Sequence, residues 1–113
     1  MEDNLIQLLE SFGFPVLRQG SLTEGKKYPS DFFTFWNIDS PIHANYNNAD
    51  YGTAYAYYVN FYSDDPDNTY NVLANARALL KAGGWAVPSK GYDVASDEPT
   101  HTGRGMEVYY LDV

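Results

Sequence analysis

The sequence contains no cysteine among its 113 residues, which excludes disulfide scaffolds, thiol catalysis and cysteine-ligated metal sites. Long apolar runs are also missing, because no stretch approaches the ~20 residues that a membrane-spanning helix needs. The first residues are acidic and show no basic region followed by an apolar one, so no secretion signal is expected. A chain of this length is expected to form one domain, residues 1–113.

Positive charge is scarce, with 7 Lys and Arg residues against 15 Asp and Glu residues, for a formal net charge of −8. The basic residues are scattered, and neutralising phosphates requires clustered Lys and Arg. We therefore expect no sequence-specific nucleic acid as a partner, and we expect an anionic membrane surface to repel the chain. Tyrosine is abundant, with 11 copies, which is typical of half-buried sheet faces or of protein–protein interfaces.

Histidine is also rare, and the two histidines, His43 and His101, lie in predicted loops. The acidic residues Asp93, Asp97 and Glu98 are close to His101 in sequence, but their spacing matches no metal or acid–base motif. Gly103 and Gly105 are too few for a nucleotide fingerprint and precede a strand rather than a helix. The sequence therefore predicts no enzyme, with no catalytic residue, no metal site and no cofactor.

Hydrophobic periodicity predicts two helices. The first runs from Asp3 to Phe12, with its apolar residues at helical spacing. The second begins within Ser63–Pro66, where an aspartate can cap the free N–H groups and proline is tolerated in the first turn. It is expected to end at Gly83 and Gly84.

Alternation of side chains predicts about five strands, and the third of them is the longest. Their expected bounds are 16–22, 31–38, 51–62, 85–87 and 106–111. The strand at 31–38 is apolar on both faces, which favours a central place in the sheet. The order α-β-β-β-α-β-β predicts an α+β fold with two layers, in which two helices cover a mostly antiparallel sheet.

Two long polar loops, Asp39–Asp50 and Lys90–Gly105, are expected to contact other subunits, because loops at strand ends often carry binding residues. In the second loop Arg104 stands between two glycines, where it is either a solvent-exposed turn residue or a forked donor to an acidic patch of a neighbour. The predicted interface residues are Arg104, Lys90, Tyr92, Asp93, His101, His43 and Tyr46. An alternative interpretation is a small carbohydrate-binding module that stacks sugars on Trp36, Trp85 and exposed tyrosines.

Three segments carry a resemblance to a known family: FTFWNxDSP at 33–41, NFYSDDP at 60–66 and GYDVASDExTHTGRG at 91–105. Together they resemble a family of small proteins from the structural-gene clusters of long-tailed bacteriophages and prophages, described as tail-terminator, tail-completion or head–tail joining components. The similarity extends from Leu5 to Leu111. It implies an α+β subunit that forms a ring, often a hexamer, on the head-proximal end of the tail tube.

The same resemblance implies the partners and the place of action. The partners are further copies of the chain, tail-tube proteins and head-completion proteins. The expected location is the head–tail joint of the virion, reached through the host cytoplasm during assembly. The resemblance implies no catalytic residues.

Overall fold

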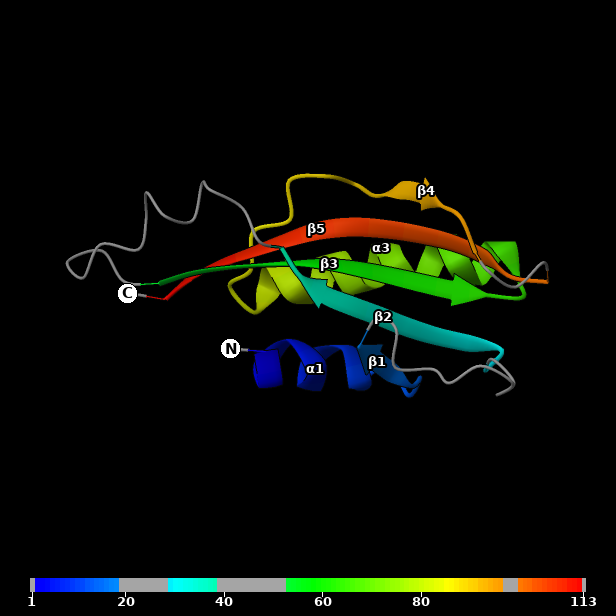
Figure 1. Cartoon of the computed structure of the whole chain (residues 1–113), viewed down its shortest axis with the longest axis horizontal. Helices are drawn as coiled ribbons and strands as arrows, with labels where there is room; N and C mark the ends of the chain where they lie inside the picture. The colour runs from blue at the N-terminus through cyan, green and yellow to red at the C-terminus, as the bar shows by residue number, and fades with distance from the viewer. Residues whose placement is uncertain (1, 19–28, 39–52, 97–99, 113) are drawn as a thin grey trace.

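The computed structural model describes residues 2–18, 29–38, 53–96 and 100–112. They contain two α-helices and one five-stranded sheet, drawn in Figure 1. The helices are α1 (Glu2–Glu10) and α3 (Pro66–Ala82); the strands are β1 (Val16–Arg18), β2 (Asp31–Asn37), β3 (Thr53–Ser63), β4 (Tyr92–Val94) and β5 (Thr102–Asp112). The predicted α+β fold and its element order are confirmed.

The sheet has the strand order β1-β2-β3-β5-β4. All neighbouring strands are antiparallel except β1 and β2, which run parallel. As predicted, β2 lies inside the sheet, with β1 on one side and β3 on the other. The long pair β3 and β5 forms the centre, with Thr53 opposite Asp112 at one end and Ser63 opposite Thr102 at the other.

Helix α3 begins and ends where its sequence signals predict. The Asp65 carboxylate accepts a hydrogen bond from the backbone N–H of Asp67 at 3.0 Å, and Pro66 occupies the first turn, where its missing N–H costs nothing. At the other end the Gly83 N–H donates to the carbonyls of Leu79 and Leu80, both at 3.0 Å. These caps satisfy backbone groups that have no partner within the helix.

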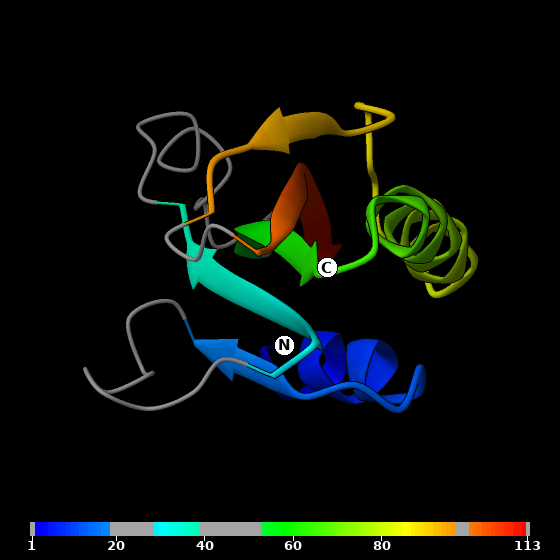
Figure 2. The same cartoon turned by 90° about the vertical axis from the view of Figure 1, so that its right-hand side faces the viewer.

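The hydrophobic core fills the space between the two helices and one face of the sheet. Figure 2 shows α1 and α3 on the same side of the strands. Helix α1 contributes Leu5 and Leu9, and α3 contributes the buried residues of its apolar stripe. The strands contribute Phe33, Phe35, Tyr57, Val59, Phe61, Met106 and Val108. The apolar stripes of both helices therefore cover one face of the sheet, as their spacing predicts.

The predicted strand at 85–87 and the predicted loop before Met106 are both corrected by the structure. Ala86 makes only an isolated bridge to Tyr109, while Trp85 and Val87 turn into the core. The fourth strand is instead Tyr92–Val94, and β5 begins already at Thr102. Two glycines in this stretch suggested a loop, because glycine is depleted in strands. Strand β1 covers Val16–Arg18 of the strand predicted at 16–22, and residues 19–22 lie outside the described part of the chain.

Candidate functional site

The structure places the described residues of the predicted interface at one end of the sheet. Asp93 and Tyr92 belong to β4, Lys90 is exposed just before it, and His101 immediately precedes β5. The prediction that Arg104 lies in a loop was wrong, because the residue belongs to strand β5. The predicted residues His43 and Tyr46 lie outside the described residues, as does the whole of the predicted 39–50 loop.

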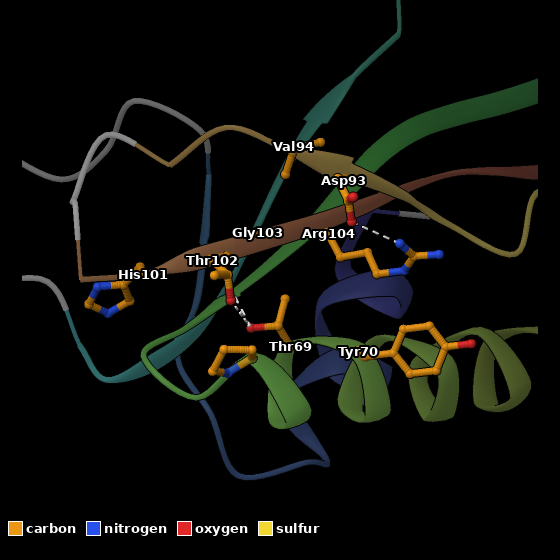
Figure 3. Close-up of a pocket in the computed structure, with 9 residues that line it drawn as sticks. Thr69, Tyr70, Asp93, Val94, His101, Thr102, Gly103 and Arg104 are labelled. Atoms are coloured by element: carbon orange, nitrogen blue, oxygen red, sulfur yellow. Dashed lines mark hydrogen bonds and ion pairs between the residues drawn. The ribbon is translucent and has the colours of Figure 1, made fainter.

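A cleft with a volume of about 470 Å³ lies between the first turns of α3 and the strands β4 and β5 (Figure 3). This volume is within the ~300–1,000 Å³ range of ligand pockets. Its lining residues are Pro66, Thr69, Tyr70, Asp93, Val94, His101, Thr102, Gly103 and Arg104. Three of the predicted interface residues, Arg104, Asp93 and His101, therefore line one cleft.

The Arg104 side chain is held by contacts with three other residues. Its Nη1 donates to Asp93 Oδ1 at 3.0 Å, and its Nη2 donates to the carbonyl of Gly91 at 3.1 Å. The guanidinium carbon lies 5.0 Å from the centre of the Tyr70 ring, in cation–π contact. Figure 3 shows the guanidinium between β4 and the Tyr70 ring. Arg104 thereby links three elements, β5, β4 and α3.

Gly91 permits this arrangement, because its backbone has a φ of 112° and the guanidinium packs directly against it. A Cβ at Gly91 would lie 3.2 Å from Nε of Arg104 and 3.2 Å from Cδ2 of Leu73. The positive φ is a conformation that side-chain-bearing residues rarely adopt. Glycine at this position therefore serves the approach of β4 to both Arg104 and α3.

Two threonines form the floor of the cleft. The hydroxyls of Thr69 on α3 and Thr102 on β5 lie 2.8 Å apart, and Figure 3 marks this contact with a dashed line. Thr69 is buried, and its hydroxyl also donates to the Asp65 carbonyl at 3.2 Å. The hydroxyl of Thr102 reaches the Ser63 carbonyl at 3.4 Å. These bonds connect the start of α3 with the start of β5.

His101 stands at the other end of the cleft from Arg104 (Figure 3). Its Nε2 lies 2.8 Å from the carbonyl of Pro29, and its Nδ1 lies 3.0 Å from the Thr100 hydroxyl. A carbonyl only accepts, so Nε2 carries the proton and His101 acts here as a tether to the chain before β2. Asp97 and Glu98 of the acidic cluster lie outside the described residues. Among the residues that the structure describes, no group of three metal-binding side chains occurs.

Aromatic side chains also occupy the sheet face opposite the helices. The Trp36 and Tyr58 rings stack at 4.8 Å between centroids, and the Phe32 and Tyr62 rings stack at 5.2 Å. Trp85, however, is only 3% exposed, and its indole N–H donates to Asn4 Oδ1 at 3.1 Å. Trp85 is therefore a core residue and cannot serve in the sugar-stacking platform of the alternative interpretation.

Tyr109 and Glu107 form a polar contact on this same face. The Tyr109 hydroxyl donates to Glu107 Oε2 at 2.7 Å. This hydrogen bond, together with partial burial, raises the pKa of Tyr109 to about 12. Burial raises the pKa of Tyr92 too, with a further contribution from the Glu107 charge. The negative charge of Glu107 thus contributes to the raised pKa of both tyrosines.

Sequence reasoning missed the α3 side of the cleft. Pro66, Thr69 and Tyr70 line it. They stand at spacings of three and four residues, which places them on one face of a helix. The apolar stripe that begins at Val72 drew the helix prediction, and this polar face in the first turns received no role. The available signal was a tyrosine within the first turns of a capped helix, at a position outside its apolar stripe.

No helix of the described residues is long and apolar enough to span a membrane. No protein-family model matches the chain, and no curated protein matches its sequence.

Proposed function

We propose that this chain is a structural subunit of the head–tail joint of a long-tailed bacteriophage, where it caps or completes the tail tube as part of a ring. The observation that carries the proposal is the resemblance of three segments, together with the place of the third in the structure. Residues 91–105 include β4 and the start of β5 and supply most of the cleft, including Arg104 and Asp93. The third segment, residues 91–105, is thus the most distinctive of the three and also supplies most of the residues that line the cleft.

The architecture is compatible with assembly into a ring. A ring uses a heterologous interface, which needs two different patches on each subunit. Here the cleft beside α3 lies at one end of the sheet, and the face opposite the helices carries stacked aromatic rings at Trp36 and Tyr58. Aromatic residues are enriched in protein interfaces because they offer a large contact area.

The charge of the chain agrees with a position around a DNA passage. A net charge of −8 in each copy gives a ring a strong negative field. Because like charges repel, such a ring would let DNA pass without binding it.

Immunogold labelling of virions that carry a tagged copy of this chain tests the location. We expect gold particles at the head-proximal end of the tail, in one cluster for each particle. Label on the capsid surface or the distal tail tip, or no label on purified virions, would contradict the proposal.

A further inference from the structure

Glu107 on β5 is a carboxylate without a counter-charge among the described residues. The ion pairs within that part of the chain have Glu2 and Asp93 as their acids. Glu107 is half-buried on the sheet face opposite the helices, where a charge loses part of its hydration. Its Oε2 accepts from the Tyr109 hydroxyl, while no described residue donates to its Oε1. One oxygen of the carboxylate therefore remains available to a ligand.

Three tyrosines surround this carboxylate. Tyr58 of β3 is the direct partner of Glu107 across the strands. Tyr109 follows two residues later on the same face of β5, and Tyr92 of β4 pairs with Gly105, two residues earlier. Side chains at such opposite and diagonal positions lie within reach of one another. The four side chains Tyr58, Tyr92, Glu107 and Tyr109 therefore form one cluster, which we call the acidic tyrosine site.

The pKa values of the tyrosines agree with this arrangement. Burial raises the pKa of Tyr92, and the hydrogen bond to Glu107 raises the pKa of Tyr109. Glu107 and Tyr58 add to both shifts through their charges, and no positive charge of a described residue lowers either pKa. The acidic tyrosine site therefore has a negative potential that its own surroundings do not cancel.

The aromatic rings of the site add a second attraction for cations. Tyr92 is 37% exposed, and Tyr58 and Tyr109 are half-buried. Trp36 stacks against Tyr58 with 4.8 Å between the ring centroids and so supports that ring. The face of an aromatic ring carries partial negative charge and attracts ammonium and guanidinium groups. A cation at this site would meet both a carboxylate and ring faces.

The available hydrogen-bonding groups favour an ammonium among the organic cations. A quaternary amine has no N–H and would leave Oε1 of Glu107 without a donor. A guanidinium binds a carboxylate best through both oxygens, but Oε2 already accepts from Tyr109. An ammonium is a compact charge with three donors, so one oxygen is sufficient for it. The site therefore suits a lysine side chain better than an arginine side chain.

We propose that the acidic tyrosine site binds the ammonium group of a lysine on a basic partner protein. The ammonium donates to Oε1 of Glu107, and the rings of Tyr58 and Tyr92 contact the charge and the alkyl chain. Tyrosine is typical of protein interfaces, which favours a protein as the carrier of the lysine. A basic protein is favoured over a second copy, because every copy carries −8. The inference rests on the proposed function for the presence of partner proteins in the virion.

Titration of the ¹⁵N-labelled chain with Nα-acetyl-lysine amide tests the site directly. The probe is compared with Nα-acetyl-arginine amide at constant ionic strength, and ¹H–¹⁵N shifts report binding. Glu107→Gln keeps the size of the side chain and removes its charge. Glu10→Gln removes the same charge from an exposed position on α1 and is the matched control. Thermal unfolding checks that both variants fold.

We expect saturable shifts centred on Tyr58, Tyr92 and Glu107, with tighter binding of the lysine probe. Glu107→Gln should weaken this binding about tenfold, the loss of one charged hydrogen bond. Tyr58→Leu should weaken it about threefold and Tyr58→Phe less, because phenylalanine keeps the ring face. Glu10→Gln should leave it unchanged. Shifts that do not saturate, equal losses in the two glutamate variants, or tighter binding of the arginine probe would overturn the proposal.

Carbodiimide treatment of purified virions tests the partner, because this reagent joins a carboxylate to an adjacent lysine amine without a spacer. We expect mass spectrometry to find Glu107 joined to a lysine of a different virion protein. A link to a lysine of a second copy, or no link at Glu107, would contradict the partner that we propose.

The outcomes separate this inference from the proposed function. A chain that ignores the lysine probe rejects the acidic tyrosine site, and the ring would stand. Gold label absent from the head–tail joint rejects the proposed function, whereas saturable binding of the lysine probe by the isolated chain would still hold.

Discussion

The side-chain carbonyl of Asn60 on β3 occupies the space that a Cβ on Gly105 of β5 would need. The two residues are direct partners in the register of the central strands. The same holds two pairs further along, where a Cβ on Gly103 would lie 2.6 Å from Cε1 of Tyr62 and 2.8 Å from Cγ2 of Val94. These glycines let larger side chains of the neighbouring strands lie across β5.

Replacing Gly105 with alanine should therefore destabilise the fold by about 1–3 kcal/mol, the usual cost of overpacking. Urea unfolding followed by circular dichroism measures the change. The double variant Asn60→Ala, Gly105→Ala removes the clash and should lose less stability than the two single changes added together. Strict additivity would show that Asn60 is not the obstacle.

The sequence predicted the elements whose signals are local. Asp65, Pro66 and Gly83 define α3 through caps that depend on neighbouring residues alone. The early start of β5 depends instead on Tyr62 and Asn60, which lie about 40 residues away and fill the space above the glycines. No local pattern contains that information, so the stretch was predicted to be a loop.

The candidate site, too, was predicted from the sequence only where its signals are local. The polar loop drew attention to Arg104, Asp93 and His101, and the structure brings these three to one cleft. The ion pair between Arg104 and Asp93 needs the pairing of β4 with β5, which could not be predicted once β4 had been assigned to a loop. Tyr70 was missed because its role depends on how α3 packs against β5.

The contact between Trp85 and Asn4 should hold α1 against the rest of the core. Asn4→Ala leaves the buried indole N–H without its described acceptor, and this should cost about 1–2 kcal/mol in free energy of unfolding. Urea unfolding of Asn4→Ala, Trp85→Phe and the double variant forms a double-mutant cycle. The cost of Asn4→Ala should nearly vanish in the Trp85→Phe background. An undiminished cost there would assign the loss to another role of Asn4 within α1.

Alkaline pH should weaken the fold through Tyr109. The pKa of Tyr109 is raised from its ordinary value of 10.0 to about 12 by the hydrogen bond to Glu107. Between these values the unfolded chain releases a proton that the folded chain keeps, so the free energy of unfolding falls as pH rises. This contribution is fully present below pH 10 and is lost through pH 12. Tyr109→Phe should flatten the decline in urea unfolding across this window, and an unchanged slope would contradict the assignment.

Self-association should strengthen from low to moderate salt. Each copy carries −8, and added salt screens their repulsion, with a Debye length of ~8 Å at physiological strength. Light scattering across a salt series measures this. A tight oligomer at low salt that dissociates as salt is added would mean that attraction between opposite charges dominates the interface.

Arg104→Ala should weaken assembly and also loosen β4. From the sequence alone we expect thermal unfolding to be nearly unchanged, but in the structure Arg104 bonds to Asp93 and Gly91 and packs on Tyr70. Hydrogen exchange should therefore accelerate at Tyr92–Val94 while the centre of β3 stays protected. Unchanged exchange in β4 would show that strand pairing alone holds it.

Electron microscopy of particles made by a phage or prophage that lacks this gene tests the central claim most directly. A ring that caps or completes the tail predicts unjoined heads and tails, or tails of abnormal length, and a plasmid-borne wild-type copy should restore joined virions. Normal, fully joined virions in the absence of the gene would contradict the proposed role at the head–tail joint.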